Sequence, residues 1–294
     1  MTAVPTVTAP LPPQVTSGQP VQSVGNTTIS TGSTAELTPT PKLAHPKVVA
    51  IVSGGLDSTT MLYDAVNKYD VVQAVSFLYG QRHQKELDYA EATCEKLHVP
   101  WSLIDLWSSG LTDLFSNSGS SLVNFNVDVP EGSYDDETMK ATVVPNRNMI
   151  MISIAGGIAV AKDAQSIMLG VHAGDHAIYP DCRPRFIDAA QDALIVANDG
   201  FGNLSNSDAI LTPFLFQTKT DIAVKAFELG VPFHETWSCY KGSKYHCGRC
   251  GTCVERLEAI DEAKIRILDS GRSVPSLNDL TQYDDTEFWK EATA

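Results

Sequence analysis

The chain has 294 residues, of which 43% are hydrophobic, and it carries a net charge of −14 with an isoelectric point near 4.8. This length suits one large α/β domain or two smaller ones, and the acidity argues against stable binding to nucleic acid or to anionic membranes. The sequence lacks an apolar run of the ~18 residues that a membrane helix needs, a signal-peptide pattern and a secreted disulfide framework. We therefore expect a cytoplasmic protein.

The first 45 residues differ from the rest of the chain. They contain no Phe, Tyr or Trp, and eight of the sixteen prolines fall within the first 46 residues, among many Thr, Ser, Val and Gln. Such a segment cannot bury enough apolar surface to offset the entropy lost on ordering. We expect residues 1–45 to be a disordered extension; the alternative is a targeting or partner-docking arm.

Ordered structure is expected from Lys47 onward, as strands that alternate with helices. Short apolar runs rich in β-branched residues indicate buried parallel strands, and apolar residues recurring every three or four positions indicate helices. The predicted strands are 48–52, 71–78, 101–106, 166–171 and 210–212, and the predicted helices are 57–68, 84–97, 146–162, 185–197, 218–229 and 254–268. A long loop at 107–143, with one helical turn near 111–115, interrupts this alternation. The order predicts an α/β fold, with an open, mostly parallel five-stranded sheet and helices on both of its faces.

A glycine-rich turn, Ser53-Gly54-Gly55-Leu56-Asp57-Ser58, joins the first strand to the first helix. Ligands of open α/β sheets bind beyond the carboxyl ends of the strands, and glycine N–H groups, hydroxyls and a helix N-terminus together suit a pyrophosphate. A carboxylate beside phosphates is repulsive unless it holds Mg²⁺ or N–H groups, so Asp57 favours a metal–nucleotide site. The alternative is a plain turn in which Asp57 caps the helix.

Four cysteines lie within fifteen residues, namely Cys239, Cys247, Cys250 and Cys253. Their spacing suits a tetrahedral Zn²⁺, and four thiolates close the coordination that a catalytic zinc would leave open, so we expect one structural zinc per chain. We therefore divide the ordered chain into an α/β domain at 46–232 and a small zinc-binding subdomain at 233–294. Of the other cysteines, Cys94 is expected in the core, and Cys182 is either a buried apolar residue or a nucleophile; we favour a site-lining role without covalent chemistry.

The turn resembles the pyrophosphatase loop of the ATP-dependent adenylating enzymes, and it implies an adenine nucleotide alpha hydrolase-like fold. Five further segments narrow the resemblance to the 7-cyano-7-deazaguanine synthases, over about residues 47–256. They are Tyr79-Gly80-Gln81-Arg82-His83 with Glu86; Val144-Pro145-Asn146-Arg147-Asn148; Asp175 with Tyr179-Pro180-Asp181-Cys182-Arg183; Thr212-Pro213 with Lys219; and the cysteine cluster led by Trp237-Ser238-Cys239-Tyr240.

This resemblance implies an ATP-dependent ligase that forms C–N bonds. Its substrates would be 7-carboxy-7-deazaguanine and ammonia. The acid would be adenylated and converted to an amide, and a second ATP would activate the amide oxygen, whose loss leaves the nitrile. Mg²⁺ and a structural Zn²⁺ are implied as cofactors, and a homodimer as the assembly.

The resemblance also implies roles for individual residues. ATP would bind the segment Val52, Ser53, Gly54, Gly55, Leu56, Asp57, Ser58, Thr59, Thr60, Met61 and Leu62. The catalytic candidates are Asp57, His83, Arg147, Asp175, Asp181, Arg183 and Lys219, and the substrate-binding candidates are Arg82, Asn148 and Tyr179. The arginines and the lysine would face the triphosphate and the substrate carboxylate, an aspartate would accept from the guanine-like N–H edge, and His83, with a pKa near neutrality, would relay a proton from ammonium.

Each role has a structural alternative. Arg82 and Glu86 would pair on a helix surface, Asn146 and Asp181 would cap helices, and Lys219 would be a solvated helix residue. Two other functions also fit the sequence: a tRNA-modifying ligase or thiolase with the same loop, which the acidic charge disfavours, and a non-catalytic module that binds nucleotide and zinc.

Overall fold

The computed structural model describes residues 45–293 apart from 112–114, 200 and 203–207. The predicted extension at 1–45 therefore lies outside the described residues, except for its last residue. The predicted helical turn at 111–115 falls largely on the gap at 112–114.

The described residues form one five-stranded sheet in the order β3-β2-β1-β4-β5. The strands are β1 (Lys47–Ile51), β2 (Asp70–Leu78), β3 (Trp101–Asp105), β4 (Ser166–Met168) and β5 (Ile210–Leu211), and all four pairings are parallel. The predicted parallel sheet is thus confirmed. The fourth strand ends three residues early because the chain turns at Gly170, where an added Cβ would lie 3.3 Å from the Cα of Ser58.

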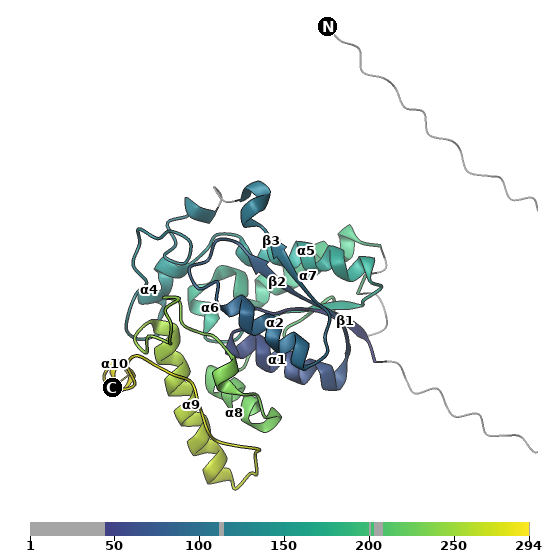
Figure 1. Cartoon of the computed structure of the whole chain (residues 1–294). Helices are drawn as coiled ribbons and strands as arrows, with labels where there is room; N and C mark the ends of the chain where they lie inside the picture. Colours follow the sequence, from purple (N-terminus) through teal and green to yellow (C-terminus); the bar gives the residue numbers. More distant parts are fainter. Residues whose placement is uncertain (1–44, 112–114, 200, 203–207, 294) are drawn as a thin grey trace, which may run out of the picture. The chain divides into compact units, whose positions relative to one another are not determined.

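Two apolar layers cover the two faces of the sheet, and β1 supplies both. Val49 and Ile51 pack in one layer, whereas Val48 and Ala50 pack in the other, as the period of two of a strand requires. Helices α5 (Arg147–Ala161) and α7 (Pro184–Ala197) contribute to the first layer, and α1 (Leu56–Lys68), α2 (Glu86–Lys96) and α8 (Lys219–Leu229) to the second. Figure 1 shows α1 and α2 on one side of the strands and α5 and α7 on the other. Cys94 is fully buried in the second layer, as predicted.

The long connection after β3 is mostly irregular, as predicted, but it is anchored to the core. It contains a π-helical turn (Trp107–Leu111), α4 (Asp136–Met139) and a 3₁₀ turn (Lys140–Thr142). Leu122 and Met139 are fully buried in the first apolar layer. The guanidinium of Arg82 donates to the carbonyl oxygens of Ser121, Asn124 and Val127 at 2.9–3.2 Å. The connection is therefore held beside the carboxyl end of the sheet.

The remaining elements lie beyond β4 and in the C-terminal third. Helix α6 (Asp175–Ile178) and 3₁₀ turns at Pro180–Cys182 and Phe233–Glu235 were not predicted, and α10 (Phe288–Ala292) follows the long helix α9 (Gly251–Ser270). That helix begins three residues earlier than predicted because Cys250 is its N-cap. No single helix in the described part of the chain is long and apolar enough to cross a bilayer; Asp136–Thr142 and Arg147–Ala161 reach that length only as a pair bent by 58°.

Gly54 is required in the turn between β1 and α1. Its φ is +85°, and an added Cβ would lie 2.0 Å from the carbonyl oxygen of Glu86. The left-handed backbone alone costs a residue with a Cβ about 1–2 kcal/mol, and the overlap with fixed backbone adds to that. Only glycine fits this position without moving α2.

We therefore expect Gly54→Ala to lower the free energy of unfolding by more than about 2 kcal/mol, measured by urea denaturation. Gly271→Ala is the matched control, since Gly271 also has a positive φ (+64°) but nothing within 4 Å of an added Cβ. The control should lose only about 1 kcal/mol. Equal losses in the two variants would contradict the proposed clash with Glu86.

Candidate active site and metal centre

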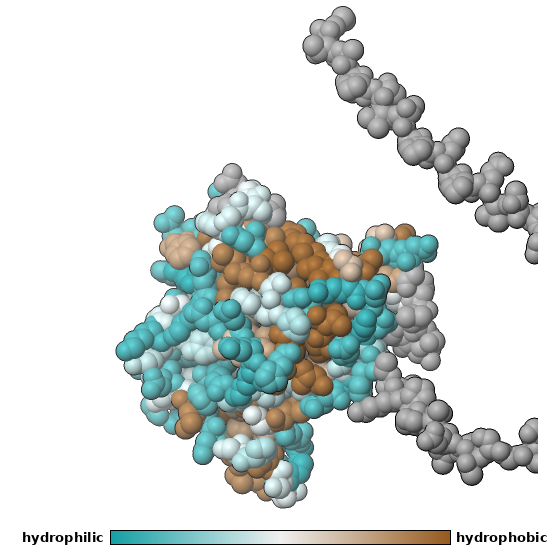
Figure 2. All heavy atoms as spheres, turned by 45° about the vertical axis from the view of Figure 1, so that its right-hand side comes forward, coloured by the Kyte–Doolittle hydropathy of each residue, from teal (hydrophilic) through white to brown (hydrophobic). Residues whose placement is uncertain are grey.

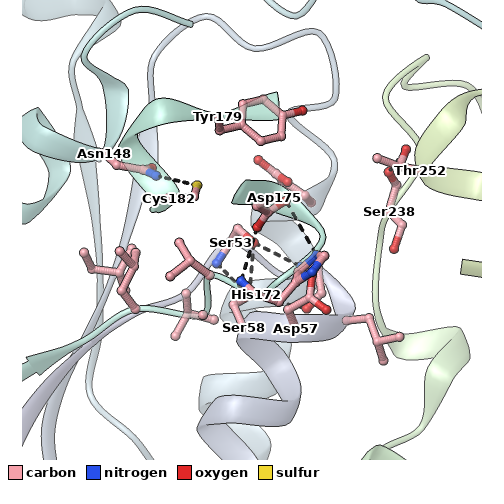
Figure 3. Close-up of a pocket in the computed structure, with 18 of the residues that line it drawn as sticks. Ser53, Asp57, Ser58, Asn148, His172, Asp175, Tyr179, Cys182, Ser238 and Thr252 are labelled. Carbon is pink, nitrogen blue, oxygen red and sulfur yellow. Dashed lines mark hydrogen bonds and ion pairs between the residues drawn. The ribbon is translucent and has the colours of Figure 1, made fainter. Parts of the chain in front are cut away.

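A cavity opens at the carboxyl ends of β1 and β4, with the glycine-rich turn as its floor. Ser53 is exposed at this floor, and its backbone N–H and hydroxyl meet the hydroxyl of Ser58 at 3.1 and 3.0 Å. The backbone N–H of Gly55 donates to Ser53 Oγ over a long 3.3 Å. These donors surround the start of α1, so the turn presents hydroxyl and N–H groups where the helix carries partial positive charge. Figure 3 shows Ser53, Ser58 and Asp57 together at the base of the cavity.

Asp57 and Lys219 form the central ion pair of the cavity. Lys219 Nζ lies 2.6 Å from Asp57 Oδ2 and 3.5 Å from Glu255 Oε2. Burial opposes the charge of Asp57, but Lys219, His172 and Arg256 together hold the pKa of Asp57 below its usual value. Its second oxygen, Oδ1, is buried and has no hydrogen-bond partner among the described residues. Burial raises the pKa of Glu255, and Lys219 and His172 only partly offset that effect.

His172 and Asp175 stand above this pair and close one wall. Gly174 donates its N–H to His172 Nδ1 at 3.1 Å, and His172 Nε2 lies 3.6 Å from Asp175 Oδ1. Asp175 also accepts from the Tyr134 hydroxyl at 3.0 Å. Tyr179, whose hydroxyl meets that of Thr142 at 2.7 Å, continues the wall. Figure 3 shows His172, Asp175 and Tyr179 rising from the floor, with Ser238 and Thr252 across the cavity.

The first turn of α5 forms a second wall. The N–H of Asn148 donates to Asp181 Oδ2 at 3.0 Å, so Asp181 satisfies a helix N-terminal group that the Asn146 side chain leaves free. Asn148 Nδ2 reaches the sulfur of Cys182 at 3.2 Å. Burial raises the pKa of the Cys182 thiol, with Asp175 and Asp181 adding to that rise, so this thiol has little thiolate character. Arg147 lines the same wall and reaches the Tyr79 hydroxyl at 3.4 Å.

His83 and Glu86 are the buried titratable groups of the third wall. The Nε2 of His83 lies 3.5 Å from Glu86 Oε1, and Gln81 donates to the same oxygen at 3.3 Å. Burial, assisted by Arg147 and Arg82, lowers the pKa of His83 to about 3. The predicted near-neutral pKa of His83 is therefore wrong, because a buried imidazole next to two guanidinium groups resists charging. Burial raises the pKa of Glu86 to about 8.

The structure brings most of the predicted site residues together, but not all of them. The cavity lining includes Val52, Ser53, Gly55, Leu56, Asp57, Ser58, His83, Arg147, Asn148, Asp175, Tyr179 and Lys219. Gly54 lies behind the floor, and Thr59, Thr60, Met61 and Leu62 are buried farther along α1. Three other candidates lie outside the lining for clear reasons: Arg82 binds the carbonyl groups of the long connection, Asp181 caps α5, and exposed Arg183 donates to the carbonyl of His176 at 2.7 Å.

Several lining residues were not among the predicted site residues: Tyr79, Glu86, Tyr134, His172, Ser238, Tyr240, Thr252 and Glu255. Some had a signal, since Tyr79, Glu86 and Tyr240 belong to the quoted motifs and His172 ends the predicted fourth strand. Tyr134 sits in the long connection and Glu255 on α9. Neither position has a local pattern that indicates a cavity, because only the tertiary fold brings these segments to β1.

The four clustered cysteines converge on one point. Each offers a sulfur atom, the four sulfurs lie within 4.8 Å of one another, and all four residues are buried. The N–H groups of Cys250 and Arg249 point at Cys247 Sγ from 3.2 and 3.4 Å. Hydrogen bonding among the four thiols lowers the pKa of Cys247 and Cys250 and raises the pKa of Cys239 and Cys253. Four buried sulfurs at this separation, with N–H donors that stabilise thiolates, fit tetrahedral Zn²⁺.

The floor of the cavity fits a nucleotide that carries Mg²⁺. The unpartnered Asp57 Oδ1 is a hard oxygen ligand of the kind that Mg²⁺ prefers. Gly54 brings the turn close to α2, and its carbonyl accepts the Trp237 N–H at 2.9 Å, so the turn is fixed on both sides. The turn is therefore held in a fixed conformation at the place where the sequence predicts a phosphate site.

The chain is similar to a known protein family, to curated relatives and to solved structures. Residues 47–264 match the family model described as queuosine biosynthesis protein QueC. A 7-cyano-7-deazaguanine synthase of Brucella anthropi is 46% identical over 246 residues, covering 84% of this chain and 97% of that protein. The synthase of Allorhizobium ampelinum is 45% identical over 248 residues, with the same two coverages. Among solved structures, the NMN synthetase of Francisella tularensis aligns with a TM-score of 0.40 at 14% identity, covering 85% of each chain.

Proposed function

The chain belongs to the QueC family of queuosine biosynthesis proteins, and from that premise we propose how its residues share the work. The chain is an ATP-dependent 7-cyano-7-deazaguanine synthase. Membership of this family decides against the two other functions that the sequence allowed. The observation that supports our assignment of roles is one cavity that joins the glycine-rich turn, the Asp57–Lys219 pair and the wall of Asp175 and Tyr179.

ATP is proposed to bind with its phosphates over Ser53, Gly55 and Ser58. Backbone N–H groups and hydroxyls would donate hydrogen bonds to the phosphate oxygens, and Asp57 Oδ1 would hold Mg²⁺, which would neutralise charge on the phosphates. Lys219 is within reach of the same point, since it already pairs with Asp57 at 2.6 Å. The turn, its metal ligand and its lysine thus stabilise the charge that develops as pyrophosphate leaves.

The substrate 7-carboxy-7-deazaguanine is proposed to bind across the upper walls. The Asp175 carboxylate suits the donor edge of the guanine-like ring, and the Tyr134 hydroxyl holds that carboxylate in place at 3.0 Å. Tyr179 and Asn148 lie beside it, and Arg147 suits a planar carboxylate. Cys182 would pack against the ring as a neutral thiol, because its raised pKa opposes covalent chemistry.

The reaction is proposed to use the same activation twice. The substrate carboxylate attacks the α-phosphorus, pyrophosphate leaves, and the acid oxygen becomes part of a good leaving group. Ammonia forms the C–N bond as AMP departs, and the amide oxygen then leaves by the same route with a second ATP. Each oxygen of the acid therefore departs on one AMP, and no free water is produced.

The segment from 233 to 294 is proposed to act as a zinc-binding subdomain that completes the cavity built by residues 46–232. Trp237 donates to Gly54, and Ser238, Tyr240 and Glu255 line the cavity. One structural Zn²⁺ held by the four cysteines would fix the start of α9 and so the position of Glu255. The six cysteines are unpaired in this structure, and a reducing cytoplasm would keep the four ligands available.

We also propose a homodimer that forms through an apolar face. Val160 on α5 and Val196 on α7 are 40% and 87% exposed, both helices pack on the same face of the sheet, and Figure 2 shows apolar side chains gathered broadly on the face turned forward. Large exposed apolar patches mark association surfaces.

The nucleotide site is tested by Asp57→Asn, which keeps the shape of the side chain and removes its charge. We expect turnover of 7-carboxy-7-deazaguanine with ATP, Mg²⁺ and ammonium, followed by mass spectrometry, to fall roughly 10²–10³-fold. Asp64→Asn is the control, because Asp64 is a buried carboxylate on the same helix but pairs with Lys68 and Lys225 outside the cavity. Wild-type turnover in Asp57→Asn would refute the assignment.

The zinc assignment predicts about one zinc per chain by elemental analysis. Cys250→Ser should yield zinc-free or aggregated protein, because a lost thiolate leaves the closed site incomplete. Cys94→Ser provides the control, since Cys94 is equally buried but lies in the sheet core, and it should keep its zinc. Active wild-type protein without zinc would overturn the proposal.

The dimer is tested by sedimentation velocity of the wild type and of the double variant Val160→Glu with Val196→Glu. We expect a dimer for the wild type and a monomer for the double variant, because charges on an apolar interface are costly to bury. A wild-type monomer at tens of micromolar would contradict this surface.

A further inference from the structure

The reaction requires a proton acceptor, which neither the phosphate site nor the zinc site provides. Ammonium brings four N–H bonds to the active site, and the nitrogen of the nitrile keeps none. Carbon–nitrogen bonds form and carbon–oxygen bonds break without any oxidation, so all four hydrogens leave as protons. A proton acceptor must therefore face the nitrogen throughout both halves of the reaction.

His83 and Glu86 are titratable residues of the cavity that take no part in the proposed phosphate chemistry. They are 3% and 8% exposed, and both line the cavity that contains Ser53 and Asp57. Glu86 is the first residue of α2, and its carbonyl oxygen packs against Gly54 of the phosphate turn. The backbone that carries Glu86 is thus fixed against the phosphate turn, and both side chains line the cavity in which we place the substrate.

The geometry of the two side chains is that of a relay. The Nε2 of His83 faces Glu86 Oε1 at 3.5 Å, whereas its Nδ1 is buried and has no hydrogen-bond partner in the described part of the chain. A proton on Nε2 directed at the carboxylate leaves the lone pair of Nδ1 free. The Tyr240 ring packs against the imidazole with centroids 5.0 Å apart and fixes its plane.

We propose that His83 and Glu86 form a proton-accepting dyad that removes the N–H protons of the incoming nitrogen. This inference rests on the proposed function. Nδ1 of His83 takes a proton from ammonium, and later from the nitrogen bonded to carbon, while its Nε2 proton passes to Glu86. The same transfer serves both formation of the amide, as AMP leaves, and formation of the nitrile, as the second AMP leaves. Between the steps Glu86 releases its proton to solvent, and the imidazole proton returns from Nδ1 to Nε2 by exchange with solvent, so that the dyad can accept again.

The electrostatic surroundings suit this role. The charged and titratable groups near the dyad are Arg82, Arg147, Tyr79 and Tyr240. Burial and the two arginines disfavour a charged imidazole, so His83 passes a proton on by gaining it at Nδ1 as it loses one from Nε2. The final acceptor is Glu86, whose pKa burial raises to about 8. A carboxylate with this pKa is a stronger base than an exposed carboxylate, and it accepts protons readily at mildly basic pH.

The test separates nitrogen chemistry from adenylation. In Glu86→Gln, pyrophosphate release from ATP and 7-carboxy-7-deazaguanine without ammonium should stay within about threefold of wild type, because no N–H proton moves in that step. Amide formation from ammonium, and nitrile formation from added amide, should each slow roughly 10²–10³-fold. His83→Asn should show the same pattern, and Asp64→Asn should match the wild type in all three steps.

Hydroxylamine provides a readout that a structural role of Glu86 would not change. Its conjugate acid is far more acidic than ammonium, so it arrives uncharged and needs one proton fewer removed. The defect of Glu86→Gln should therefore shrink severalfold with hydroxylamine. With this nucleophile the wild-type rate should rise with pH to a plateau above about 8, the pKa of Glu86, since only the carboxylate accepts protons, and the variant should lose that rise.

The outcomes of these measurements distinguish failure of the proposed dyad from failure of the proposed function. Wild-type rates of both nitrogen steps in Glu86→Gln would overturn the dyad, and so would loss of pyrophosphate release in a folded variant, because the residue would then act through the phosphate turn. Absence of pyrophosphate release in the wild type would instead overturn the proposed function. An equal defect with ammonium and hydroxylamine would also reject the relay.

Discussion

The ion pair between Asp57 and Lys219 is the constraint on which the cavity depends. It joins the first turn of α1 to the first residue of α8, and Glu255 brings α9 to the same lysine at 3.5 Å. Because Asp57, Lys219 and Glu255 are poorly hydrated, leaving any of their charges unpaired would cost free energy. Their pairing therefore holds three helices from distant parts of the chain at one point. The pair also leaves Asp57 Oδ1 unpartnered. The fold therefore maintains an ionised carboxylate at the mouth of β1, ready for a cation.

The cysteine centre extends this constraint to the C-terminal segment. Helix α9 begins at Gly251, directly after its N-cap Cys250, and its adjacent residues Glu255 and Arg256 point about 100° apart around the helix axis. Glu255 enters the cavity, while fully buried Arg256 donates to Thr236, Phe233 and Tyr283 behind it. A metal that orients the first turn of α9 thereby positions a cavity carboxylate without touching the substrate. Such a role agrees with four protein ligands and no open position.

Local patterns in the sequence predicted the sheet and the turn well, because period-two and period-3.6 repeats and glycine chemistry are set within a few residues. The helix of Asp175–Ile178 was missed because four residues are too short for a periodic signal. Arg82 illustrates a different limit. Its residue type suits a phosphate ligand, yet its guanidinium binds three carbonyl groups of the long connection, and no spacing in the sequence encodes that choice. Likewise, the pKa of His83 depends on burial and on arginines that only the fold brings near.

The charge balance of the cavity explains how an acidic protein can handle a polyanion. Among the described lining residues, four carboxylates, Asp57, Glu86, Asp175 and Glu255, face only Arg147 and Lys219 as permanent cations. Such a site would repel free ATP, because like charges at close range in a poorly solvated pocket interact strongly. It should therefore bind ATP better when Mg²⁺ neutralises part of the phosphate charge, and in our proposal Asp57 holds that ion. Burial raises the pKa of Glu86 to about 8, so this side chain adds little negative charge at neutral pH, and in our proposal it accepts protons at a position separate from Asp57.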